Sequence, residues 1–96
     1  MSDTMRNLVL AQAVSELAAL LDYKQQRTEA TILRGEAHTL ATGHPDRYDG
    51  GGLAALQRLN RIRGGIQTVM KLPLSPDEQA VAETVALRIQ RALQGN

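Results

Sequence analysis

Residues 53–72 carry the strongest local concentration of one charge in the sequence. They contain four cations and no acid, whereas the whole chain of 96 residues has a formal net charge of +1. A helix over this segment places cations, amides and a glycine on its polar surface. Arginine and lysine bind phosphate well, and a glycine allows a ligand to approach the backbone closely. The candidate binding residues are Arg58, Arg61, Arg63, Gly64, Gln67 and Lys71.

Three interpretations of this basic surface stay open. The first is a phosphate site for a nucleotide or a nucleic acid, although the pI of about 8.2 and the lack of interleaved aromatic residues do not favour it. The second is an ordinary solvated face whose arginines pair with Glu29, Glu36 or Glu83 on neighbouring helices. The third is a docking surface for an acidic protein, because arginine is favoured at interface centres.

Residues for catalysis or metal binding are scarce. Cysteine is absent, and the three serines lie near a terminus, within an expected helix and at an expected helix start. His38 and His44 are the only imidazoles, so a metal site would have to add carboxylates such as Glu36, Asp46 or Asp49. We therefore expect no enzyme activity, no metal site and no cofactor.

The tetrapeptide His-Pro-Asp-Arg at residues 44–47 follows an expected helix end at Gly43. It resembles the loop motif of J-domains, the helical co-chaperone modules that stimulate the ATPase of a heat-shock chaperone. The apolar positions of residues 59–69 are similar in spacing to those of the helix after that motif. Residues 30–43, however, hold only Arg34 as a fixed cation where the family has a strongly basic helix. The alternative is that the proline simply follows a helix end and the aspartate starts a turn.

The first part of the chain predicts a long amphipathic helix. Apolar residues recur at helical spacing from residue 5 to residue 21, and a looser pattern resumes after residue 29. Residues 22–29 contain no Gly or Pro, so we expect one helix over about 5–42, with a break near 22–29 as the alternative. One stripe of the first half is predicted to be a core face or an oligomer interface: Leu10, Val14, Leu17 and Leu21.

Two further helices are expected over 53–72 and 76–93. The apolar phase of the first continues through Gly64 and Gly65, which indicates one helix in spite of two glycines. Ser75, Pro76 and Glu78 have the spacing of a capping box, which marks the start of the last helix.

These patterns predict a single all-α domain over residues 1–96, a helical bundle of three to four amphipathic helices. Only two residues are aromatic, so the core must be aliphatic and thin. We therefore expect oligomerisation to complete it, most simply as a twofold homodimer, with a compact monomer as the alternative.

The composition also bears on location and function. The first apolar stretch is too short and too polar for a signal peptide or a membrane span, and the lack of cysteine fits the cytoplasm. The sequence thus favours a non-catalytic interaction protein that binds another protein, as an adaptor, an inhibitor or an accessory regulator does. Nucleic-acid or nucleotide binding through the basic segment is the second hypothesis.

Overall fold

The protein is described by a computed structural model covering residues 3–42 and 52–94, with side chains for 5–42 and 56–94. These ranges contain helices and no strand, which confirms the all-α prediction. The second helix ends at Thr42, directly before Gly43, as predicted. The last helix begins at Pro76, directly after Ser75, as the capping box predicted. The helices are α1 (Asp3–Tyr23), α2 (Arg27–Thr42), α4 (Gly52–Met70) and α5 (Pro76–Leu93).

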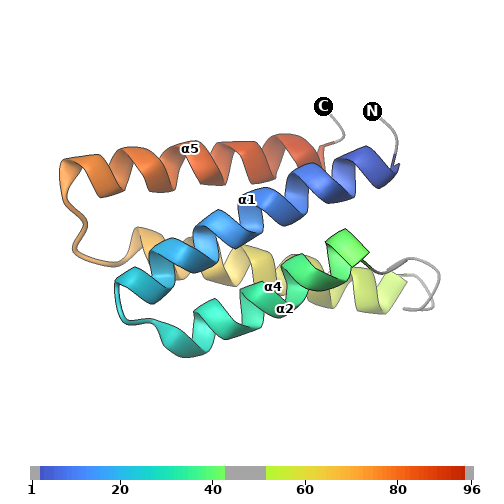
Figure 1. The fold of residues 1–96 in the computed structure, drawn as a ribbon, viewed down its shortest axis with the longest axis horizontal. Helices are drawn as coiled ribbons and strands as arrows, with labels where there is room; N and C mark the ends of the chain where they lie inside the picture. Colours follow the sequence, from blue (N-terminus) through green and yellow to red (C-terminus); the bar gives the residue numbers. More distant parts are fainter. Residues whose placement is uncertain (1–2, 43–51, 95–96) are drawn as a thin grey trace.

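The four helices form an up-and-down bundle in which consecutive helices are antiparallel (Figure 1). Helix α1 is the central element, because it packs extensively against both α2 and α5. Helix α4 lies behind α1 in this view and packs less extensively against each of its neighbours. The weaker packing of α4 leaves room along its surface, which the candidate site uses.

The preferred prediction of one continuous helix over 5–42 is wrong, and its alternative, a break near 22–29, is correct, because the chain reverses between α1 and α2. The turn is a Schellman motif: the N–H of Gln26 donates to the carbonyl of Leu21 at 2.8 Å, and the N–H of Gln25 donates to that of Asp22 at 2.9 Å. Gln25 has a φ of 69°, a left-handed conformation that usually favours glycine. Packing of α2 on α1 offsets the cost of that conformation. No glycine or proline marked the reversal in the sequence.

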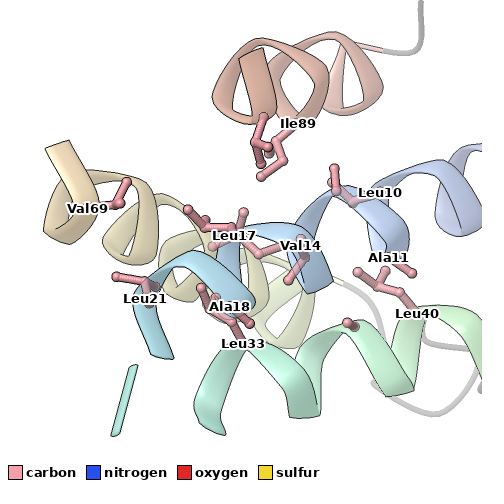
Figure 2. Packing of buried hydrophobic residues seen from close by; sticks show 14 of the residues in the cluster. Leu10, Ala11, Val14, Leu17, Ala18, Leu21, Leu33, Leu40, Val69 and Ile89 are labelled. Carbon is pink, nitrogen blue, oxygen red and sulfur yellow. The ribbon is translucent and has the colours of Figure 1, made fainter. Parts of the chain in front are cut away.

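The core lies around α1 and is aliphatic, as the composition predicts. The stripe of Leu10, Val14, Leu17 and Leu21 is buried within a single chain, between the other three helices (Figure 2). These side chains are therefore core residues and are not available to a second copy. The largest fully buried side chains are Leu17, Leu21, Leu33, Ile62, Ile89, Val14 and Val69.

Helix α4 runs through both of its interior glycines without interruption, as the apolar phase predicts. A Cβ on Gly65 would lie 2.5 Å from Cδ1 of Leu33 on α2, so the glycine permits the two helices to approach closely. Gly64 faces open space, with no atom within 4 Å of such a Cβ.

A pair of hydrogen bonds fixes the start of α5. The side chain of Ser75 accepts from the N–H of Glu78, and the carboxylate of Glu78 accepts from the N–H of Ser75 at 2.8 Å. The same carboxylate accepts from Nζ of Lys24 at 3.1 Å, which ties the α1–α2 turn to α5. The Ser75 N–H, and then Lys24, hold the pKa of Glu78 below its ordinary value of 4.5.

Stability is therefore expected to depend on the protonation of Glu78. Because the pKa of Glu78 is lowered in the folded state, its contribution to stability is fully present above about pH 4.5, the unfolded-state pKa. This contribution is lost as the pH falls through the lowered pKa. Glu78→Gln should have a lower Tm than the native protein at neutral pH, and the two Tm values should converge in acid. Lys24→Met should lose only part of the effect, because the Ser75 N–H remains. Parallel Tm curves for the native protein and Glu78→Gln would contradict this assignment.

Over the two described ranges, no helix has the length and apolar character that crossing a membrane requires.

Candidate functional site

The six residues predicted as a basic binding surface do not gather at one place. Arg58 and Arg61 extend toward α2, where both meet Glu36. Arg63 and Gln67 line a groove between α4 and α5. Gly64 contributes only open backbone, and Lys71 lies exposed in the turn that follows α4. Arg58 and Arg61 therefore lie toward α2, whereas Arg63 lies in the groove beside α5.

Glu36 connects α2 to α4 through two arginines. Its Oε1 accepts from Nη1 of Arg61 at 2.6 Å, and its Oε2 lies 3.4 Å from Nε of Arg58. The side chains of Glu36 and Arg58 are each only 11% exposed, whereas that of Arg61 is 50% exposed. The interpretation that the arginines pair with an acid of a neighbouring helix is thus confirmed for these two.

This pairing changes the electrostatics of the basic segment. A carboxylate between two guanidinium groups offsets one positive charge and occupies donors that a phosphate would need. The inner arginine, Arg58, is also too deeply placed to reach a ligand in solution. Within the described part of the segment, Arg61, Arg63 and Lys71 are exposed, and of these three Arg61 is held by Glu36.

A groove of about 650 Å³ separates α4 from the C-terminal half of α5. Its apolar side chains are half-buried and its polar side chains are exposed. The polar members are one arginine and three amides, and no acid lines it among the residues that the structure describes. The lining residues are Leu59, Arg63, Ile66 and Gln67 from α4, Gln90 and Leu93 from α5, and the C-cap residue of α5, Gln94.

The two walls of this groove have a simple origin in the sequence. Leu59, Arg63 and Ile66 fall on one side of α4, because residues three, four and seven positions apart share a helix face. Gln90, Leu93 and Gln94 share a face of α5 for the same reason. Arg63 and Gln67 were predicted as binding residues from the sequence, but the α5 wall of the groove was not. The helical spacing of the α5 residues can be recognised in the sequence. The sequence does not show that this face of α5 lies opposite α4.

A second, shallower recess of about 430 Å³ lies between α1 and α2. Half of its lining residues are alanine or serine, and His38, which also lines it, is exposed. No group of three potential metal ligands occurs in the described ranges. The residues that line the recess are Leu8, Ala11, Gln12, Ser15, Arg34, Ala37, His38 and Ala41.

The His-Pro-Asp-Arg motif of residues 44–47 lies outside the described residues. No family model, no curated protein and no solved structure matches this chain. The resemblance of that motif to J-domains therefore gains no support from these comparisons.

Proposed function

We propose that this chain is a non-catalytic interaction protein that binds an acidic amphipathic segment of another protein in the groove between α4 and α5. The observation that carries the proposal is the chemistry of the groove. Its half-buried leucine and isoleucine side chains offer apolar contact, and its rim has a cation but no described acid. A partner with apolar anchors flanked by carboxylates would complement both features.

The dimensions of the groove suit a helix. Leu59 and Ile66 are seven residues apart on α4, a rise of about 10 Å or two helical turns. An amphipathic helix that docks in a groove uses anchors at positions such as i, i+3 or i+4, and i+7, which repeat over the same length. The exposed amides of Gln67, Gln90 and Gln94 provide donors and acceptors for polar side chains beside those anchors.

Phosphate binding is the weaker alternative for the same surface. It requires several cations at one place, and Arg58 and Arg61 are instead engaged by Glu36. Arg63 alone brings a fixed charge to the groove. The proposal also includes a cytoplasmic location, for which the lack of cysteine is the support, and weak self-association as a homodimer.

A designed peptide tests the groove directly. The probe is a helical peptide of about 15 residues with leucines at i, i+4 and i+7 and glutamates beside them. In methyl-labelled protein, we expect it to shift the NMR signals of Leu59, Ile66 and Leu93. Arg63→Ala should weaken binding about fivefold, the size of one rim ion pair. Arg27→Ala, at an exposed position on α2, is the matched control and should not change the affinity.

Two results would contradict the proposal. One is a titration in which the methyl signals of the groove do not move while others do. The other is a stronger response to inorganic phosphate or a nucleotide than to the peptide, with a steep dependence on salt. That second result would favour the phosphate alternative.

A further inference from the structure

The apolar surface of α4 extends beyond both ends of the α4–α5 groove. Leu56 is three residues before Leu59, and Met70 is four residues after Ile66. Both therefore fall on the helix face that lines the groove. Their side chains are 51% and 39% exposed. We define the α4 seam as the five residues of this face, which are Leu56, Leu59, Arg63, Ile66 and Met70.

The spacing of the α4 seam is a heptad repeat. Its members are separated by three, four, three and four residues, which is the pattern of a and d positions in a coiled coil. The bundle core uses a different face of the same helix, that of the buried residues Ile62, Gly65 and Val69. The α4 seam is therefore a second stripe, which the other helices cover only in part.

Helix α5 extends the opposite wall of the groove in the same way. Leu87, which is 46% exposed, is three residues before Gln90 and seven before Gln94, so it shares their helix face. Because α4 and α5 are antiparallel, Leu87 and Met70 lie toward the same end of the groove (Figure 1). The apolar contact surface thus continues over about 21 Å, the length of α4 from residue 56 to residue 70.

Arg63 is the middle residue of the α4 seam, with two apolar members before it and two after it. Among the described residues, no acid forms an ion pair with Arg63, whereas the nearby Arg61 is held by Glu36. Glu83, an acid on the same face of α5 as Leu87, lies a full turn farther from the centre of the groove. The groove therefore presents a cation at its centre and apolar side chains toward both ends.

This central charge argues against a second copy of the chain as the occupant. In a parallel coiled coil, a positions face a positions, so two copies of Arg63 would oppose each other. In an antiparallel coiled coil, a positions face d positions, so Arg63 would face Leu59 or Ile66 of the other copy. Neither arrangement supplies an acid for the guanidinium group, whereas a different helix with an acid at the facing position does.

We infer that the groove takes one helix of a different protein by coiled-coil packing, and that this helix carries a single acid within its apolar stripe, opposite Arg63. The inference rests on the proposed function and specifies its partner more closely. The partner's stripe covers five a and d positions, or about 15 residues, and its carboxylate lies inside the stripe. A polar pair within such a seam fixes the register and the choice of partner. Arg63 is thus the residue that determines specificity.

Two helical peptides of identical composition test the position of the acid. Both carry leucine at the four outer a and d positions. The central form has glutamate at the middle position, whereas the displaced form has alanine there and the glutamate on the opposite helix face. Their net charges are equal, so general electrostatic attraction does not distinguish them. By calorimetry, the native protein should bind the central form about tenfold more tightly. Arg63→Leu should prefer the displaced form and keep the native Tm within a few degrees, because residue 63 is exposed.

Alanine variants test the length of the contact. Leu56→Ala and Met70→Ala should each weaken binding of the central form about fivefold, because each removes apolar area that the partner covers. Val81 on α5 and Ile32 on α2 are matched controls, since they are 51% and 41% exposed. Val81 is seven residues before Arg88 and so lies on the side of α5 that faces α1. Val81→Ala and Ile32→Ala should leave the affinity unchanged.

Three results would overturn this inference and leave the proposed function standing. The first is equal affinity of the native protein for the two peptides. The second is an affinity that neither Leu56→Ala nor Met70→Ala changes. The third is movement of the Leu59 and Ile66 methyl signals when the native protein alone is diluted, which would place a second copy in the groove. If neither peptide shifts the methyl signals of the groove, the proposed function fails as well.

Discussion

Replacing Glu36 with methionine is expected to lower the free energy of unfolding by about 2 kcal/mol. The carboxylate lies 3.4 Å from Nε of Arg58, and both side chains are only 11% exposed. Methionine has a similar length but carries no charge, so the buried guanidinium group of Arg58 would lose this ion pair. Arg61 adds little to this loss, because it is half exposed and can turn toward water.

Urea denaturation of three variants measures this effect and identifies its cause. Glu36→Met should be the least stable. The double variant that adds Arg58→Met should recover most of the loss, because replacing a buried ion pair with packed apolar side chains is often close to neutral. Glu83→Met, at an exposed position on α5, is the control and should change the stability by less than about 0.5 kcal/mol. A Glu36→Met variant as stable as the control would show that the ion pair is not structural.

Replacement of the two adjacent glycines of α4 with alanine is expected to change the stability of the protein in opposite directions. Gly64→Ala should stabilise the protein by about 0.5–1 kcal/mol, because alanine favours helix and the new Cβ meets open space. Gly65→Ala gains the same propensity but places its Cβ 2.5 Å from Cδ1 of Leu33, which is fully buried and confined by the core. Overpacking of this kind costs about 1–3 kcal/mol, so the net effect is a loss.

Thermal unfolding of the two single variants and the native protein checks this prediction. For a domain of this size, 1 kcal/mol corresponds to a shift in Tm of about 4–8 °C. The two Tm values should therefore lie on either side of that of the native protein. If Gly65→Ala were as stabilising as Gly64→Ala, the close approach of α2 and α4 would not depend on the missing side chain.

The parts of the fold that local chemistry determines could be predicted from the sequence. Ser75 and Glu78 form the expected capping box, and α4 continues through its glycines because the apolar phase does. A break near 22–29 was only the alternative to a continuous helix, and its position at Gln25 could not be predicted, because a glutamine in a left-handed conformation leaves no compositional signal. Its position is set by the packing of α2 on α1, which only the folded chain contains.

The candidate site was predictable only in its residue types. The basic character of α4 is visible in the sequence, and Glu36 was one of three acids that could pair with its arginines. Which acid does so depends on how α2 and α4 are placed side by side. The groove also needs the face of α5 that carries Leu93, and no pattern within α4 points to it. Sites formed between helices follow from tertiary packing more than from local spacing.

The central claim is that the α4–α5 groove selects a protein partner by apolar contact and opposite charge. Calorimetric measurement of binding affinity, with the charges of the peptide and of the groove reversed, tests this claim most directly. The leucine peptide is made in two forms, one with glutamates and one with lysines beside the leucines. The native protein should prefer the glutamate form, and Arg63→Glu should prefer the lysine form, because the charge of the rim is reversed. Equal affinities of both proteins for both peptides would contradict the claim.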